Sequence, residues 1–446
     1  MNLTLLLVLV GYNVYFADLH SHTELSDGQG LPADAYSYAR DTARIDILGL
    51  TDHTRYMTAG AYAQARLTAE NFCRPGAFIA LAGQEFGSLG TGGFGHLSIY
   101  DADSLCPVSE YDLTRFYQWL ASKAEPAQFN HPSLVDFNAF AYDRAADAYV
   151  TTLEVVNGSG KYTIENEAMF FDALRKGWHC APVANQDNHS KHWGNAETYL
   201  HQIPLTGILA DTLTKEAILD AILKRRVYAQ EARPADDRIY LRRFSVGSAE
   251  MGAQQALGES SAAFALEVQA DSDFRQLYLY RNGELFDSAT VNPAGLDTNH
   301  VTWTRNVPVG NDYYLVRGEQ YPAIVDTSIA IDHFWTAPVW VSYRAPPRTL
   351  EFHPNPLRTS ARIVAARDTH PVDHAEIDVF DAAGRPVFHH VLSAEEYAGD
   401  RLSSQWNGHD AQDRILPNGV YLVKLQVSYA GQSGRHILTG KLAIER

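Results

Sequence analysis

Histidine and carboxylate side chains that could bind metal ions recur along the first half of this chain, each close to a short apolar run typical of a β-strand. Two pairs are spaced two residues apart at such a run, His20 with His22 and Asp187 with His189. Because side chains alternate along a strand, the members of each pair can face the same way and hold one cation. The pattern predicts a multinuclear metal centre whose candidate ligands are His20, His22, Asp27, His53, Glu85, His96, His131, Asp187 and His189.

A centre of this kind indicates hydrolysis. Divalent ions held by imidazole and carboxylate groups lower the pKa of coordinated water to about 7, which makes hydroxide available at neutral pH. Two ions about 3.5–4 Å apart stabilise both the attacking and the leaving oxygen of phosphoryl hydrolysis. Glu85 and Asp187 are the predicted bridges between ions, and with His131 and Arg55 they form the set of candidate catalytic residues.

Other polar residues near these motifs could support the ligands or the substrate. Asp18 and Asp52 are placed to fix the tautomers of ligating histidines, although Asp18 fits a solvated strand position equally well. A phosphate group would need a cation outside the metal cluster, for which Arg55 is the first candidate, followed by Lys161 and Lys191. A solvated surface charge is the commoner role of such residues.

Strands and helices alternate in the region that carries the ligands. Strands are predicted at residues 14–19, 45–50, 78–82, 96–100, 127–130, 152–156 and 181–184. Helices are predicted at 32–44, 111–124, 166–176 and 214–226, with Thr214 as the N-cap of the last. The alternation is typical of an α/β barrel or a doubly wound sheet. The ligands favour the barrel, whose active sites gather at the carboxyl ends of the strands. The glycine-rich segment 88–95 is predicted to be a flexible loop over this site.

The sequence pattern of the second half of the chain is typical of β-strands. Short strands are predicted at 265–268, 277–280, 301–304, 313–317 and 339–342, with Asn282 and Gly283 as a hairpin turn. A Pro-containing linker at residues 345–348 precedes strands at 376–380, 386–391, 419–427 and 438–444. The predicted fold class is α/β plus all-β. Its predicted parts are a candidate signal segment (1–13), a barrel (14–235) and two β-sandwiches (236–345 and 346–446).

Composition limits the function classes. The 446 residues are 46% hydrophobic and 20% charged, which suits a globular protein of several domains. A net charge of −17 argues against nucleic acid as a stable partner. Cys73, Cys106 and Cys180 form no CxxC motif, so either Cys73 pairs with Cys106 or all three are free thiols. The apolar run at residues 3–10 is shorter than the roughly 20 residues of a membrane span. It indicates a secretory signal or the approach to the first strand.

The segment YFADLHSHTELSDG, followed by LGLTDHT, resembles the polymerase-and-histidinol-phosphatase (PHP) superfamily of metal-dependent phosphoesterases, in particular its carbaryl-hydrolase-like branch. The resemblance covers roughly residues 14–235 and implies a distorted (β/α)7 barrel with two or three divalent ions (Zn, Mn or Fe). It implies that Glu154 lies behind the ligands or beside the substrate. The ligand sets that it implies are His20, His22, Glu85 and Asp187; Asp27, His53 and Glu85; and His96, His131 and His189.

The C-terminal region is similar to a second family. Its segments HPNP, VFDAAGRPV and WNGHDAQDRILPNGVYLVKLQV resemble the immunoglobulin-like domain of flagellar hook-capping proteins and the sorting domains of type IX secretion substrates. This resemblance implies a secreted, periplasmic or cell-surface protein, with secretion machinery or the cell surface as a partner. The middle sandwich matches no family beyond an immunoglobulin-like pattern.

The expected activity is hydrolysis of a small-molecule phosphate ester by a metal-activated hydroxide. The same hydroxide could attack a carbamate or carboxylic ester. An alternative from another class is a surface-attached binding or adhesion protein in which the metal is structural. The full ligand set argues against that reading, because structural sites are usually closed and seldom need three ions.

Overall fold

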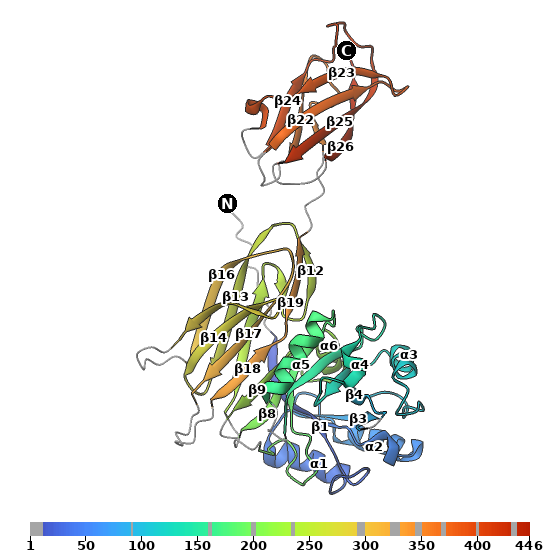
Figure 1. Cartoon of the computed structure of the whole chain (residues 1–446), viewed down its shortest axis with the longest axis vertical. Helices are drawn as coiled ribbons and strands as arrows, with labels where there is room; N and C mark the ends of the chain where they lie inside the picture. The colour runs from blue at the N-terminus through green and yellow to red at the C-terminus, as the bar shows by residue number, and fades with distance from the viewer. Residues whose placement is uncertain are drawn as a thin grey trace. The chain divides into compact units, whose positions relative to one another are not determined.

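The computed structural model describes residues 12–90, 92–158, 163–197, 202–232, 237–291, 299–321, 331–343, 350–366, 372–397, 401–429 and 435–446. The chain divides into two compact units, residues 1–344 and 345–446 (Figure 1). The apolar run at 3–10, the linker at 345–348 and Lys161 lie outside the described residues. Among the residues that are described, no helix is both long and apolar enough to cross a membrane.

Nine strands and six helices of the first unit surround the predicted metal ligands. The strands are β1 (Asn13–Ser21), β2 (Ile47–Leu50), β3 (Ile79–Ser88), β4 (Gly95–Tyr100), β5 (Ala127–Asn130), β6 (Val150–Asn157), β7 (Ala181–Asn185), β8 (Ile203–Ala210) and β9 (Val227–Ala232). The helices are α1 (Pro32–Tyr38), α2 (Ala59–Phe72), α3 (Leu113–Lys123), α4 (Asp136–Phe140), α5 (Thr163–Arg175) and α6 (Lys215–Leu223). Each predicted strand and helix of this region overlaps an observed one, whereas β8, β9, α2 and α4 were not predicted.

The strands form a curled sheet in the order β9-β8-β1-β2-β3-β4-β5-β6-β7. Pairing is parallel for β1 with β2, β2 with β3, β5 with β6 and β6 with β7, but β4 and β8 run antiparallel to both of their neighbours. The curl brings β7 close to β1, β8 and β9. The sheet is therefore mixed and partly closed, where the sequence resemblance implied a distorted (β/α)7 barrel.

Local sequence accounts for the ends of several helices. Thr214 accepts a hydrogen bond from the backbone N–H of Ala217 (3.3 Å), so it is the N-cap of α6, as predicted. Asp112 caps α3 in the same way through Arg115 N–H (3.0 Å). The predicted helix at 32–44 begins as α1 and continues as a π-helical turn, Ala39–Ala43, that ends at the left-handed Arg44.

The curled sheet that carries the predicted ligands continues into the β-rich half of the same unit. Its strands are β10 (Ile239–Val246), β11 (Ala249–Glu250), β12 (Gln254–Leu257), β13 (Ser261–Ala270), β14 (Phe274–Arg281), β15 (Glu284–Thr290), β16 (His300–Pro308), β17 (Asn311–Gln320), β18 (Asp332–Thr336) and β19 (Val339–Tyr343). β18 pairs antiparallel with β9, so β17, β18, β19, β12, β14 and β15 belong to the sheet that contains β1. Strands β11-β10-β13-β16 form a separate sheet. The predicted hairpin is present, with Asn282 and Gly283 at φ 54° and 81° between β14 and β15.

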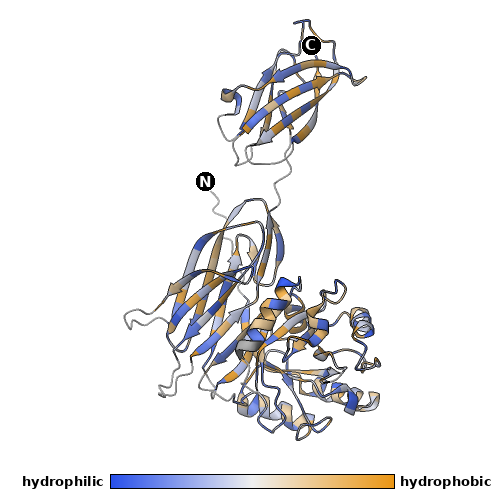
Figure 2. Ribbon diagram, viewed as in Figure 1, coloured by the Kyte–Doolittle hydropathy of each residue, from blue (hydrophilic) through white to orange (hydrophobic). Residues whose placement is uncertain are grey.

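The second unit consists of two sheets. They contain β20 (Leu350–His353), β21 (Ala361–Ala366) and β24 (Arg401–Trp406), and β22 (Val372–Phe380), β23 (Pro386–Val391), β25 (Gly419–Tyr429) and β26 (His436–Ile444). Hydrophilic and hydrophobic residues alternate along these strands (Figure 2), as expected when one face of a sheet packs on a core. The core includes Trp406, Val423 and Leu442.

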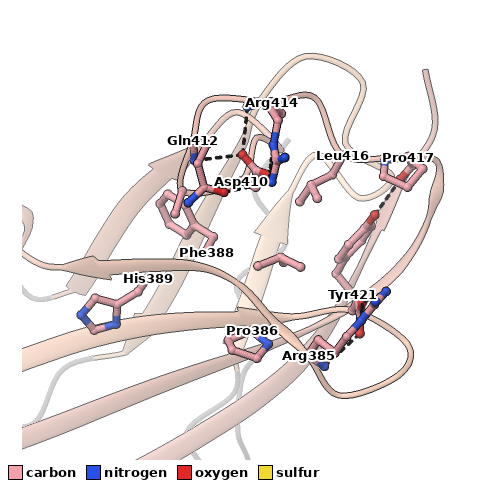
Figure 3. Close-up of a pocket in the computed structure, with 13 residues that line it drawn as sticks. Arg385, Pro386, Phe388, His389, Asp410, Gln412, Arg414, Leu416, Pro417 and Tyr421 are labelled. Atoms are coloured by element: carbon pink, nitrogen blue, oxygen red, sulfur yellow. Dashed lines mark hydrogen bonds and ion pairs between the residues drawn. The ribbon is translucent and has the colours of Figure 1, made fainter.

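A hollow of about 500 Å³ lies on this second unit (Figure 3). Asp381 accepts a hydrogen bond from Arg385, and Asp410 accepts one from Arg414. The two loops that contain these pairs line the hollow together with Tyr421. Both arginines are thus neutralised locally. The three groups of metal-type ligands found among the described residues all lie in the first unit instead.

Candidate metal centre

The predicted ligands converge at one edge of the curled sheet. His20 lies near the end of β1, while His22, His53 and His131 follow β1, β2 and β5, and Asp187 follows β7. His96 does not follow a strand but is the second residue of β4. Because β4 runs antiparallel between β3 and β5, its start lies at the same edge as their ends.

The first group of ligands consists of His20, His22 and Glu85, all fully or almost fully buried. The two Nε2 atoms of the histidines lie 3.2 Å apart. Glu85 Oε1 is 3.2 Å from His20 Nε2, and its Oε2 is 3.6 Å from His22 Nε2. Asp187 joins this group, since its Oδ1 is 3.4 Å from His20 Nε2 and 3.2 Å from His22 Nε2.

A second group lies closer to the surface and contains Asp27, His22, His53 and His189. Asp27 Oδ2 is 3.5 Å from His53 Nε2, and Asp27 Oδ1 is 3.4 Å from His189 Nε2. The His189 ring stacks on that of His22, with ring centroids 4.2 Å apart. The side chains of Asp27 and His189 are 40% and 41% exposed, so this group is open to a substrate.

The third group is formed by Glu85, His53 and His96. Glu85 Oε2 is 2.9 Å from His53 Nδ1, and its Oε1 is 3.2 Å from His96 Nδ1. His131 extends the group, with its Nε2 3.3 Å from His96 Nδ1 and 3.5 Å from Glu85 Oε1. In each of the three groups, the potential ligand atoms lie within 4.8 Å of one another.

Two of the three ligand sets implied by the sequence resemblance differ from the observed groups. Asp27 and Glu85 were expected together with His53, but they lie in separate groups that share His53. His189 was expected beside His96 and His131, but it contacts Asp27 and His22 instead. The reason is the backbone at the end of β7, where Asp187 adopts a left-handed conformation (φ 45°). In that turn, His189 Nδ1 lies 2.9 Å from the Asp187 backbone carbonyl oxygen.

The acceptor that orients His20 is Glu154 rather than an aspartate. His20 Nδ1 lies 2.8 Å from Glu154 Oε1, at the centre of β6, so His20 directs Nε2 toward the ligand group. Asp18 accepts hydrogen bonds from Ser21 Oγ and from backbone N–H groups. Asp52 accepts them from Thr23 and Ser26. The described hydrogen bonds thus assign neither aspartate to a histidine ring, which corrects the expectation for Asp52. Asp18 is also fully buried, so it is not a solvated strand residue either.

Asn130 is a further residue of the site that the sequence did not reveal. Its Nδ2 donates to Glu85 Oε1 (2.8 Å) and lies 3.4 Å from His20 Nε2. Asn130 ends β5 immediately before His131, and it pairs with His96 across the sheet. Its position beside a predicted ligand was the only available signal.

The electrostatics of the site favour cations. Burial by itself lowers the pKa of His20 and His131, but Asp187, Glu154 and Glu85 outweigh it. The pKa of His20 therefore lies well above its usual value, and that of His131 is raised to about 9. Burial raises the pKa of Glu85 and Asp187, yet the nearby histidines hold both well below the usual range. Protons on the imidazole rings thus balance the negative charge of the buried carboxylates. Divalent cations bound by these imidazole and carboxylate groups would take the same role.

Basic residues do not enter the cluster in the described part of the chain. Arg55 is exposed, and its guanidinium lies 4.8 Å from the centre of the Tyr56 ring, so it stands at the rim of the site. Lys191 is also exposed. The glycine-rich segment expected to be a flexible loop is the hairpin between β3 and β4, in which Ser88 pairs with Gly95.

An open cleft of about 720 Å³ adjoins Asp187 and His189. Amide and hydroxyl groups dominate its lining, which also includes Glu197. Gln186 uses its side-chain carbonyl to bind Gly194 N–H and Ala196 N–H, and this fixes the cleft wall. The cleft gives a solvent path to the second ligand group.

Comparisons with known proteins add little to this geometry. No family model and no curated protein matches the chain. A two-domain protein from Bacteroides vulgatus ATCC 8482, described as containing a predicted PHP-like metal-dependent phosphoesterase, is similar with 16% identity and a TM-score of 0.41, over 73% of this chain and 96% of that one. Dimeric latent PorU from Porphyromonas gingivalis is similar with 13% identity and a TM-score of 0.22, over 55% of this chain and 24% of that one. The fibronectin(III)-like modules of CbhA from Clostridium thermocellum are similar with 11% identity and a TM-score of 0.15, over 45% of this chain and 94% of theirs.

Proposed function

We propose that this chain is a metal-dependent hydrolase of the PHP type that cleaves phosphate esters. The observation that carries the proposal is the sharing of ligands: Glu85 and His53 each belong to two of the three groups, and His22 connects the buried group with the open one. A structural metal site needs no such shared residues and is usually closed. Here one group is exposed to a cleft, as a catalytic site requires.

The side chains of the site have different proposed roles in the reaction. His20, His22, His53, His96, His131 and His189, with Asp27, Glu85 and Asp187, would hold two or three divalent ions, which supply hydroxide at neutral pH and stabilise charge on the ester oxygens. Glu154 and Asn130 hold His20 and Glu85 in position. Arg55 at the rim would meet the phosphate. In the overall step, a water oxygen bonds to phosphorus, the phosphorus–oxygen bond to the alcohol breaks, and the alcohol oxygen takes a proton.

Carbamate or carboxylic ester hydrolysis is the second candidate, because the same site would deliver hydroxide to a carbonyl carbon. Histidine and carboxylate ligands suit Zn, Mn and Fe alike. From the sequence resemblances we also propose that the protein is exported to the periplasm, the cell surface or the medium, and that the second unit serves secretion or attachment.

Metal analysis and a substrate panel test the proposal. We expect the purified protein to bind two or more equivalents of Zn or Mn and to hydrolyse phosphate esters faster than carbamates or carboxylic esters. Glu85→Gln keeps the shape of the shared ligand but removes its charge, so metal content and activity should both fall at least tenfold. Glu216→Gln, an exposed carboxylate on α6, is the matched control and should change neither.

The outcomes separate the candidate functions. Preferential turnover of carbamates or carboxylic esters would replace the phosphoesterase assignment with the second candidate. A protein that binds two ions but hydrolyses none of these substrates would instead support a binding or adhesion role.

A further inference from the structure

Two amide side chains of β5 lie directly behind the first ligand group. Gln128 and Asn130 are two residues apart on this strand, so their side chains point to the same face of the sheet, and both are fully buried. Gln128 Nε2 donates to Asn130 Oδ1 (2.7 Å) and to Glu154 Oε1 (3.1 Å). One amino group therefore contacts both of the residues that hold the candidate ligands Glu85 and His20.

The orientation of the Gln128 amide is fixed at its carbonyl end. Gln128 Oε1 accepts hydrogen bonds from the Tyr100 hydroxyl (2.7 Å) and from Asn185 Nδ2 (3.1 Å). Burial raises the pKa of Tyr100 well above its usual range, so this hydroxyl keeps its proton and donates. Asn185 is itself held by its Oδ1, which accepts from Leu19 N–H (2.9 Å). The carbonyl end of Gln128 therefore faces two donors, and its amino end faces the metal centre.

The Asn130 amide is fixed in turn by Gln128. Asn130 Oδ1 accepts from Gln128 Nε2, so Asn130 Nδ2 faces Glu85 Oε1 (2.8 Å) and Ser98 Oγ (2.9 Å). The reversed amide would place a carbonyl oxygen against a buried carboxylate, and neither group has a hydrogen to share. Glu85 therefore receives this donor only while Gln128 presents its amino group to Asn130.

The same amino group steadies the carboxylate that orients His20. Glu154 Oε1 lies 2.8 Å from His20 Nδ1, and it accepts from Gln128 Nε2 and from Asn185 Nδ2 (3.2 Å). Its other oxygen accepts from the backbone N–H of His131 (2.7 Å). A fully buried polar group that loses a partner costs free energy, so this set of contacts holds the carboxylate in one orientation.

We propose that Gln128 is a positioning residue that sets the metal affinity of the first ligand group. It acts on Glu85 through the amide of Asn130. It acts on His20 through the carboxylate of Glu154. Among the described hydrogen bonds, none joins Gln128 to a candidate ligand, so it works only through these neighbours. The inference rests on the proposed function and extends its metal centre to a residue that touches neither ion nor substrate.

Gln128→Met tests the proposal on the full chain. Methionine is similar in length to glutamine but cannot donate to Asn130 or Glu154. We expect the Kd for Zn, measured by competition with a chelator, to rise about tenfold. Cobalt provides a second readout, because His and carboxylate ligands also bind Co and its visible absorption bands report the ligand geometry. We expect these bands to shift in the variant.

Gln230→Met is the matched control. Gln230 is a fully buried glutamine of β9, and its Oε1 accepts from Ile239 N–H (2.9 Å) rather than from this network. The same substitution should therefore lower the Tm, as it does at Gln128, but leave the Kd for Zn and the Co bands unchanged. A residue with only a structural role would behave in this second way.

Tyr100→Phe removes a single hydroxyl and provides an independent variant if Gln128→Met does not fold. It takes away one of the two donors that orient the Gln128 amide, while Asn185 retains the other. We expect the Kd for Zn to rise in the same direction as in Gln128→Met, but by a smaller factor.

The contrary results are distinct. If Gln128→Met folds with the wild-type Kd and Co bands, or if Gln230→Met changes both as strongly, the inference is wrong, and hydrolysis of phosphate esters by the wild type leaves the proposed function in place. If Gln128→Met does not fold, an unchanged Kd in Tyr100→Phe overturns the inference. If the wild-type protein binds no divalent ion, the inference and the proposed function fail together.

Discussion

At the scale of single residues, Glu85 connects the histidines of the candidate metal centre. Its two carboxylate oxygens lie between 2.9 and 3.6 Å from nitrogens of five histidines, His20, His22, His53, His96 and His131. Burial of a carboxylate costs free energy unless a group of opposite charge or a hydrogen-bond donor pairs with it, and here several histidine rings do so. The sequence identified Glu85 and these five histidines, because each lies close to a short apolar run. It did not identify Asn130, whose role depends on pairing across the sheet.

Glu154 is expected to set the affinity for metal without being a ligand. Replacing it with glutamine removes the charge that faces His20 Nδ1 at 2.8 Å, so the imidazole becomes a weaker donor. We expect the Kd for Zn, measured by competition with a chelator, to rise by roughly 10–100-fold. Glu216→Gln again serves as the control. An unchanged Kd in Glu154→Gln would show that this contact does not tune the ligand.

Metal binding should release protons and strengthen with pH. His131, whose folded pKa is about 9, and His20, whose pKa lies well above its usual value, carry protons at pH 7 that a cation must displace. The apparent affinity should therefore rise between pH 7 and pH 9. Calorimetry in two buffers of different ionisation enthalpy measures the protons released. A heat that is identical in both buffers would contradict the assigned protonation.

For the metal-free protein, the raised pKa of His131 predicts that stability falls as the pH rises, whereas metal affinity is expected to increase. A histidine whose folded pKa exceeds its unfolded value contributes stability that is complete below the unfolded value of about 6.5. For His131 this contribution is lost as the pH rises through about 9. We expect the Tm of chelator-treated protein to fall from pH 6.5 to pH 9.5. A Tm that rises over this range would count against a protonated His131.

At the scale of elements, the direction of β4 decides whether His96 reaches the site. The apolar run of β4 was visible in the sequence, but strand direction depends on the pairing partner, which the run does not encode. The short hairpin from β3 forces β4 to return antiparallel. His96 therefore reaches the common edge from the start of its strand.

Some helices and strands have only a weak pattern of apolar residues in the sequence. Helix α2 buries Tyr62 and Ala69 but few other side chains, so it lacks a clear apolar stripe. Strand β8 contains Pro204 and Gly207, which are uncommon inside strands. These weak patterns explain why the helix and the strand were missed, although β1 to β7 were found.

The cap of α6 offers a test at this scale. Thr214→Ala removes the hydroxyl that accepts from Ala217 N–H, and we expect the free energy of unfolding to fall by about 1 kcal/mol. Thr214→Ser keeps the acceptor and should cost much less. Urea titration measures both variants, and equal stability of alanine and serine variants would show that the hydroxyl is not needed.

At the scale of the whole molecule, the first compact unit extends to residue 344, whereas the sequence predicted a separate barrel that ends at residue 235. The sequence predicted a boundary between a barrel (14–235) and a β-sandwich (236–345). However, β9 and β18 are paired residue by residue from His333 with Glu231 to Thr336 with Tyr228, so one sheet crosses that point. Backbone pairing between edge strands leaves no side-chain pattern, and for this reason the joined sheet could not be predicted.

Truncation tests the joined sheet. A fragment of residues 12–344 should be soluble, unfold cooperatively and bind metal, because it keeps every described residue of the first unit. A fragment of residues 12–235 leaves β9 as an unpaired edge and should aggregate or self-associate. Size-exclusion chromatography and thermal unfolding compare the two. A monomeric, cooperatively folded 12–235 fragment would refute the requirement for β18.

The pairing of β9 with β18 also limits how this protein can be recombined. The sheet that carries the candidate metal ligands is completed by a strand about 100 residues further along the chain. This region therefore cannot be moved to another protein by a cut made after its last helix. Gene fusions and domain swaps should therefore preserve function when the junction lies near residue 344, and lose it when the junction lies near residue 235.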